Sequence, residues 1–414
     1  MENPSVFFYA LLWLVGWGTV GAIVTPQVYT RRDKDISQAR LAGALMGAAT
    51  GPFGLIPLWI FAPDLSRRWV VLPGLAVIAI LVWAFAQADP DNLCVTRGDF
   101  VATQIVNGLI IGSIYGLMAL GLTLIFSILG IVSFAHGEFY MIGGMVVFYM
   151  SDKWFPGISP ILAVLAAAAV TMLIGLVFER LFLRAMNTGQ VERPGEYAIL
   201  VTFGLAFFLQ YTTLALVGAN PKKVRRFFDY PRIALPSADQ PDILKVTPGN
   251  IKLFDTVSIS TPRFTAMVIA LILLVLLLVF LYRTWYGKAL RAVSQDRQAA
   301  AVTGINPNTM NTLAFGLGGM LAGISGASLV QVFSWVPWVG VPASSRSFVI
   351  IVLGGMGSLP GAFIGGLVLG LVEALGAGCV PDPQRAAAYI PAYGMVILVL
   401  VLLLKPTGLF GREL

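Results

Sequence analysis

The single histidine of this chain lies close to a glutamate, in the run Ser133-Phe-Ala-His136-Gly-Glu138 between two long apolar segments. At membrane depth an ionisable group costs at least about 2.5–3.5 kcal/mol, so it normally faces protein or water and has a partner. Ser133, His136 and Glu138 are therefore candidates for shaping or gating a path through the membrane. The alternative interpretation is that they cap and pack the start of a membrane span.

The rest of the sequence offers no catalytic or metal-binding constellation. Cys94 and Cys379 are too far apart to form a metal-ligand motif, and a single histidine makes a zinc site unfavourable. A disulfide would require both cysteines to face an oxidising compartment, and we expect two unpaired thiols. No phosphate-binding loop, nucleophile elbow or His-Glu-x-x-His motif occurs. We predict no catalytic residue, no metal site and no cofactor in this chain.

Composition determines the class of protein that must position these residues. Of the 414 residues 57% are hydrophobic and 11% are charged, against about 25% charged in a soluble domain. The prediction is an all-α polytopic integral membrane protein with about 10–11 segments of spanning length. We place these segments near 6–24, 41–62, 69–88, 103–128, 136–151, 160–178, 197–218, 264–282, 311–332, 347–377 and 389–404. The net charge of +7 is spread over the short loops, which argues against nucleic-acid binding.

The segment at 347–377 is too long for one straight span and too short for two. Its centre is rich in helix breakers, so we expect a helix broken between Gly354 and Gly361. A break exposes backbone polar groups, which a membrane tolerates only where protein or water surrounds them. Gly354, Gly357 and Ser358 therefore join the path candidates. Glu373 and Gln210, also near spans, are predicted to form hydrogen bonds between helices.

A polar, alanine-rich stretch lies between Gly287 and Gly304 and is followed by Pro307. Strong helix formers with glycine at both ends predict a short surface helix, too polar to cross lipid. Such a helix between two spans is suited to receive force from a soluble partner, and the alternative is a plain solvated loop. The residues assigned to this role are Gly287, Arg291, Ala292, Asp296, Arg297, Ala300 and Gly304.

Five runs in this order resemble the permeases of branched-chain amino acid ABC importers, in particular the subunit type usually encoded first of the two. They are Asn107–Ile125, Ser133–Met141, 286–307, Val352–Gly361 and Lys405–Gly411. The resemblance covers about 104–411. It suggests a permease core over 101–414, preceded by a membrane extension over 1–100 that has no counterpart in the usual permease.

The resemblance implies a multi-pass subunit of the bacterial inner membrane. Its implied partners are a second permease, two cytoplasmic ATPases that carry ATP and Mg²⁺, a periplasmic binding protein and membrane lipid. It makes 283–310 the cytoplasmic coupling loop and 219–262 a periplasmic loop. Charge counting alone does not orient these loops, because each carries basic residues and a single span separates them.

The solute is less well defined than the class of protein. The usual asparagine before Phe134 is Ser133 here, and this departure puts the solute in question. We expect branched-chain or other amino acids, with urea or short amides as the alternative within the same importer class. A stand-alone secondary transporter or channel is a further alternative. The extension over 1–100 is expected to serve assembly and not transport.

Overall fold

The fold is described from a computed structural model of the chain. It describes residues 97–187, 191–228, 233–235, 244–247, 249–253, 257–379, 386–405 and 407–411, with 18–29, 43–44, 46–48 and 94. The chain forms two compact units, one of Met1–Asn92 with Val399–Leu409 and the other of Leu93–Leu398 with Phe410–Leu414. In the first unit, residues 18–29 form a helix. Most of the expected segment at 41–62 and all of 69–88 lie outside the described residues, so the organisation of 1–100 stays a prediction.

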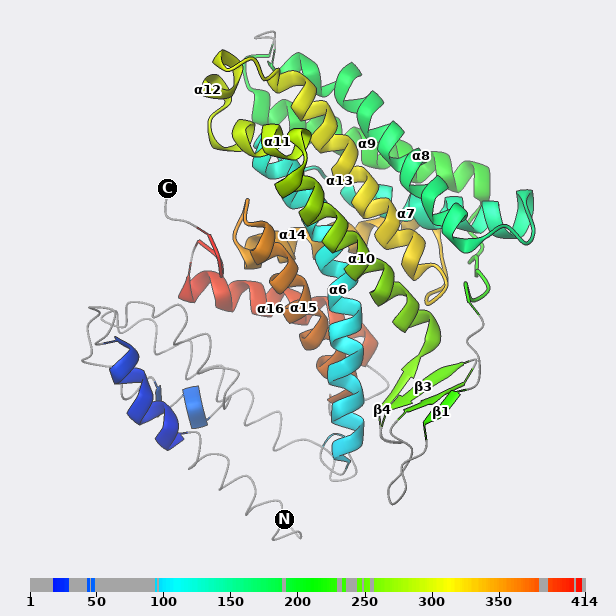
Figure 1. The fold of residues 1–414 in the computed structure, drawn as a ribbon, viewed down its shortest axis with the longest axis vertical. Helices are drawn as coiled ribbons and strands as arrows, with labels where there is room; N and C mark the ends of the chain where they lie inside the picture. The colour runs from blue at the N-terminus through cyan, green and yellow to red at the C-terminus, as the bar shows by residue number, and fades with distance from the viewer. Residues whose placement is uncertain are drawn as a thin grey trace. The chain divides into compact units, whose positions relative to one another are not determined.

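Long helices account for most of the described chain (Figure 1). They are α6 (Gly98–Leu129), α7 (His136–Phe148), α8 (Pro160–Leu181), α9 (Pro194–Val217), α10 (Thr261–Arg283), α11 (Trp285–Gln295), α12 (Arg297–Val302), α13 (Pro307–Leu329), α14 (Gly340–Gly354), α15 (Leu359–Cys379) and α16 (Ala386–Leu404). Among the described residues, seven helices are long and apolar enough to cross a membrane. Proline in the first turn marks the start of α8, α9, α10 and α13, where its missing N–H costs nothing. The prediction of an all-α polytopic membrane protein is confirmed.

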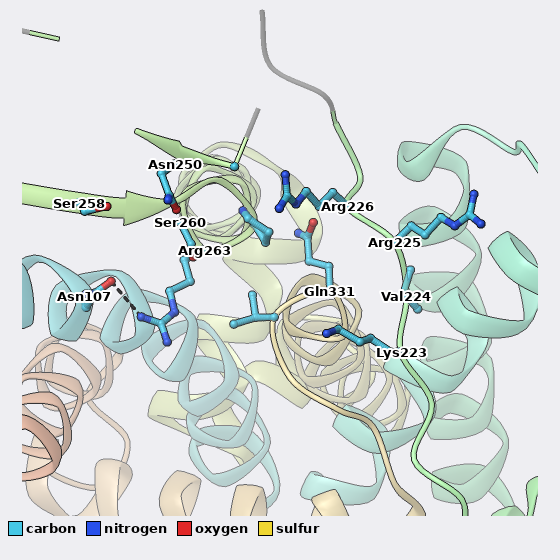
Figure 2. A pocket seen from close by; sticks show the side chains of 13 residues that line it. Asn107, Lys223, Val224, Arg225, Arg226, Asn250, Ser258, Ser260, Arg263 and Gln331 are labelled. Carbon is cyan, nitrogen blue, oxygen red and sulfur yellow. Dashed lines mark hydrogen bonds between the residues drawn. The ribbon is translucent and has the colours of Figure 1, made fainter. Parts of the chain in front are cut away.

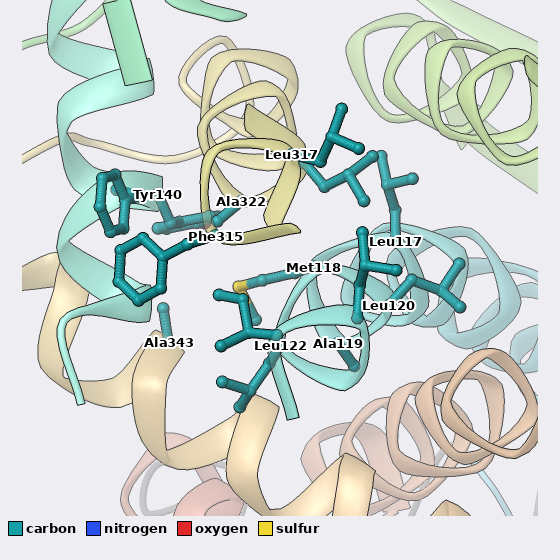
Figure 3. Close-up of a cluster of buried hydrophobic side chains, with 14 of the residues drawn as sticks. Leu117, Met118, Ala119, Leu120, Leu122, Tyr140, Phe315, Leu317, Ala322 and Ala343 are labelled. Carbon is teal, nitrogen blue, oxygen red and sulfur yellow. The ribbon is translucent and has the colours of Figure 1, made fainter. Parts of the chain in front are cut away.

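Helices α6 and α13 form the centre of the second unit. In their most apolar stretches 83% and 89% of the residues are buried, against 11% in α9. Side chains of α6, α7, α13 and α14 make a continuous apolar core, which includes Met118, Tyr140, Phe315 and Ala343 (Figure 3). These two helices are therefore enclosed by protein, whereas α9 lies at the periphery and presents apolar residues such as Leu200 outward.

Close approach of α6 and α15 depends on glycine. A Cβ at Gly112 would overlap the Gly366 carbonyl, and a Cβ at Gly370 would overlap the backbone of Gly108 and Gly112. Small residues permit such contact between helix backbones in lipid, where no hydrophobic drive favours association. These glycines therefore allow α6 and α15 to pack backbone against backbone.

The segment between α9 and α10 contains a small antiparallel sheet that the sequence did not predict. Its strands β1 (Ile233–Leu235), β2 (Leu244–Val246), β3 (Asn250–Leu253) and β4 (Val257–Ser260) pair in sequence order. Ile251 pairs with Ile259, and both side chains pack with Ile110 of α6. The sheet therefore lies beside the N-terminal half of α6, at the lower right of the bundle in Figure 1.

A disulfide joins Cys94 and Cys379, whose Cα atoms are 5.4 Å apart. The expectation of two unpaired thiols is wrong, because α6 and α15 run side by side and bring together residues separated by 285 positions. Disulfides persist in oxidising compartments. We call this end of the bundle, which also carries the sheet, the disulfide end, and the opposite end, which carries α11 and α12, the α11 end.

Candidate functional site

Helix α7 begins in the middle of the bundle instead of at either end. The His136 Nε2 atom lies 2.8 Å from the Met118 carbonyl oxygen. Met118 precedes Leu129, the last residue of α6, by a rise of about 16 Å, which is about half of a hydrocarbon core of ~30 Å. Helix α7 has 13 residues and continues without a break into a π-helix over Tyr149–Trp154, so helical structure covers the span expected over 136–151. Its first turn therefore lies near half depth.

The start of α14 meets the start of α7 at this depth. The Gly137 N–H donates to Ser344 Oγ over 2.8 Å. A Cβ at Gly137 would overlap the Gly340 carbonyl, and a Cβ at Gly340 would overlap the Glu138 carboxylate. Helix N-termini carry partial positive charge, and helices interrupted near the midplane commonly surround the substrate site of transporters. We call the meeting of α7 and α14 the mid-bundle site.

The sequence candidates Ser133, His136 and Glu138 all lie in the mid-bundle site and are buried. The Met118 carbonyl can only accept, so His136 Nε2 carries the proton of that bond and Nδ1 is an acceptor. Within the described residues Ser133 Oγ, His136 Nδ1, Glu138 Oε2 and Ser347 Oγ are buried without a hydrogen-bond partner. Each such atom costs about 1–3 kcal/mol. A path that admits water or solute would satisfy them, whereas capping alone would not.

The predicted break separates α14 from α15 at 355–358 and lies at the far end of α14 from the mid-bundle site. Gly355 and Gly357 adopt φ values of 96° and 86°, which favour glycine. The last carbonyl of α14, on Gly354, accepts from the Phe410 N–H over 2.9 Å. The Gly357 carbonyl accepts from Ser127 Oγ over 3.2 Å. The C-terminal segment and the end of α6 therefore cover the break, and Gly354, Gly357 and Ser358 do not belong to the mid-bundle site.

The polar stretch at 287–303 forms α11 and α12 at the α11 end, so a helical structure is confirmed in place of a plain loop. Asp296 separates the two helices and caps α12, because its Oδ1 accepts from Gln298 N at 2.8 Å and Ala299 N at 2.9 Å. Gly287 is buried against Phe280 and Leu281, where a Cβ would overlap their backbone. The helix pair is thereby fixed closely to the end of α10.

The remaining residues assigned to this region divide by exposure. Ala300 is buried, and the Arg291 guanidinium lies over the Tyr282 ring at 4.5 Å. Arg297 donates to Asn308 of α13 over 3.4 Å, and Ala292 is half-buried. Gly304 ends the region with φ of 88°. The outward face instead presents Ala299 and Val302, the latter 89% exposed.

A cationic cavity of about 840 Å³ opens at the disulfide end. Lys223, Arg225, Arg226 and Arg263 line it, and among the described residues no carboxylate does. Arg263 donates to Asn107 of α6 over 3.1 Å, whereas Arg225 extends away from the other labelled side chains (Figure 2). This lining attracts anions. In the sequence, the basic run Lys222-Lys223-Val-Arg225-Arg226 indicates this cavity. Counting the total charge of each loop did not identify the run.

Sequence patterns also did not identify Arg346 as a candidate site residue. It is the single basic residue between Asn311 and Cys379, and Glu373 is the single acidic one. Arg346 Nε donates to Glu373 Oε1 over 2.8 Å, and the Tyr115 hydroxyl donates to Oε2 over 3.1 Å. Glu373 therefore forms the predicted interhelical bonds. An isolated pair of opposite charges within one apolar stretch was the available signal.

These observations define a class of protein. Membrane-crossing helices that surround interrupted helices at half depth, with a polar helix pair at one end, are typical of the membrane subunit of a transporter. A family model described as "Branched-chain amino acid transport system / permease component" matches residues 104–405. The chain belongs to this family.

Relatives support the same assignment. The high-affinity branched-chain amino acid transport system permease protein BraD of Pseudomonas aeruginosa is 32% identical, over 75% of this chain and 95% of its own. The permease protein LivH of the corresponding system in Escherichia coli is 31% identical with the same coverage. A solved structure, PsaBC from Streptococcus pneumoniae in complex with Fab, aligns with a TM-score of 0.40 and 12% identity over 76% of this chain and 95% of the other.

Proposed function

We propose that this chain imports branched-chain amino acids as one permease subunit of an ATP-driven complex in a bacterial inner membrane. Relatives whose names state branched-chain amino acid transport align along almost their whole length. The complex would contain a second permease, two ATPases that hold ATP and Mg²⁺, and a periplasmic binding protein that delivers the solute. The extension over 1–100 would serve assembly of this complex.

The exposed face of α11 and α12 is the observation that carries the proposal. Val302 is 89% exposed and Ala299 lies beside it on α12, so small and apolar atoms form a surface at the end of a membrane bundle. Gly287 fixes α11 against α10, and the Arg297–Asn308 bond joins α12 to α13. A soluble ATPase bound to this face would therefore act on two membrane helices together.

The disulfide supports one orientation of the complex. An oxidised Cys94–Cys379 pair favours the periplasmic side, and α11 and α12 would then lie in the cytoplasm. This orientation agrees with the coupling loop over 283–310 and the periplasmic loop over 219–262. The cationic cavity then faces the periplasm, where a binding protein would dock.

The test is transport by the complex reconstituted in proteoliposomes. We expect leucine uptake to require ATP, both permeases, the ATPases and the binding protein, and we expect none from this chain alone. Uptake by this chain without ATP would indicate a secondary transporter or channel and contradict the proposal. Uptake of urea or acetamide in place of leucine would support an ATP-driven importer but contradict branched-chain amino acids as its solute.

A further inference from the structure

An ion pair lies inside the bundle close to half depth. Arg346 of α14 bonds to Glu373 of α15 over 2.8 Å, and Tyr115 of α6 bonds to the second Glu373 oxygen over 3.1 Å. Tyr115 precedes the end of α6 by a rise of about 21 Å, so the pair is well within the hydrocarbon region. Ionisable groups at this depth are costly and usually functional.

The bonding within this cluster is unequal. Both Glu373 oxygens have partners, one on Arg346 and one on Tyr115. Arg346 uses only its Nε atom in this way, and within the described part of the chain its two Nη groups have no bonded partner. A guanidinium usually binds a carboxylate through two parallel N–H groups. The pair therefore leaves the edge formed by the two Nη groups of Arg346 available for a second carboxylate.

The surroundings hold this edge in place. The Arg346 guanidinium carbon lies 5.4 Å from the centre of the Tyr115 ring, a favourable arrangement for a cation. The Arg346 side chain is 26% exposed and that of Glu373 is 10% exposed. Because a charge facing lipid is costly, the exposed part of Arg346 must face water or protein. Glu373 is the positioning partner in the interior.

The cluster lies beside the mid-bundle site. Arg346 lies on the first half of α14, two residues after Ser344, which bonds to the first turn of α7 over 2.8 Å. One side of α14 therefore contacts the first turn of α7, and another side carries the Arg346 cation. A solute that passes the interrupted helices would meet this guanidinium at half depth.

We propose that Arg346 binds the carboxylate of the transported solute through its two Nη groups, with Glu373 and Tyr115 as positioning residues. This inference rests on the proposed function and limits the solute to molecules that carry a carboxylate. Neutral amides such as urea cannot form the charge-assisted pair. The site would thus select amino acids inside the permease, after their release from the binding protein.

The test measures direct binding to the purified complex in nanodiscs without the binding protein. The probes are leucine, isovalerate, which keeps the carboxylate, and leucinamide, which lacks it. We expect leucine and isovalerate to bind and leucinamide to bind at least about tenfold more weakly. Arg346→Gln with Glu373→Gln, which removes both charges together, should abolish this preference, and Arg346→Lys should retain part of it.

The surface pair Arg193 and Glu196, with side chains 76% and 71% exposed, provides the matched control as Arg193→Gln with Glu196→Gln. This control should bind all probes as the wild type does. Equal binding of leucine and leucinamide by the wild type, or an unchanged preference in the assembled Arg346 double variant, would overturn the inference. Leucine uptake by the wild-type complex is measured in parallel, so that failure of the proposed function is recognised separately.

Discussion

At the scale of single residues, the mid-bundle site depends on the absence of side chains as much as on their presence. Gly137 and Gly340 let two helix starts touch, and that contact encloses the Glu138 carboxylate. Sequence patterns identified His136 and Glu138 as unusual because ionisable groups are rare in apolar segments. The patterns could not identify Gly340, because its importance depends on a contact with a residue some two hundred positions away.

Gly137→Ala should therefore destabilise the complex. The added Cβ would overlap the Gly340 carbonyl, and overpacking of this kind costs about 1–3 kcal/mol. We expect a lower Tm and less assembled complex, measured by size exclusion after heating. Gly204→Ala is the matched control, because a Cβ there meets no atom within 4 Å. If Gly137→Ala behaves like Gly204→Ala, the close contact is not required.

At the scale of elements, the sequence predicted most of the structure that local patterns determine. Apolar stretches located the spans, and glycine with proline located the break between α14 and α15. Other features depend on long-range packing, among them the Cys94–Cys379 disulfide and the start of α7 near half depth. The small sheet was missed because its strands have only three or four residues each, too few for a clear alternation.

Asp296 offers a test of the helix pair. Asp296→Ala removes the cap of α12, in which Asp296 Oδ1 accepts from Gln298 N at 2.8 Å and Ala299 N at 2.9 Å. Loss of such a cap lowers the stability of a helix by about 1 kcal/mol. We expect faster hydrogen exchange at the amides of Gln298 and Ala299 and less solute moved per ATP hydrolysed. Asp296→Asn, which can still cap, should restore both. Unchanged exchange and coupling in Asp296→Ala would contradict a capping role.

At the scale of the whole molecule, α13 connects the α11 end with the mid-bundle site. Its start bonds to α12 through Asn308 and to α8 through Thr312, whose hydroxyl donates to Glu179. Farther along, Gly323 and Gly326 lie so close to α7 that a Cβ at Gly326 would overlap the Tyr140 carbonyl. A displacement at the α11 end would therefore be transmitted by a rigid helix to the mid-bundle site, in agreement with ATP-driven import.

The most direct test of this account is Ala299→Trp, which places a bulky side chain on the exposed face of α12. Leucine uptake and ATP hydrolysis stimulated by the binding protein are measured on the reconstituted complex. Lys153→Trp, a change at another exposed position after α7, is the control. We expect Ala299→Trp to lose at least about tenfold in uptake per ATP hydrolysed, because a misfitted ATPase cannot move α12 and α13 together. Wild-type uptake and wild-type stimulation in Ala299→Trp would contradict the account.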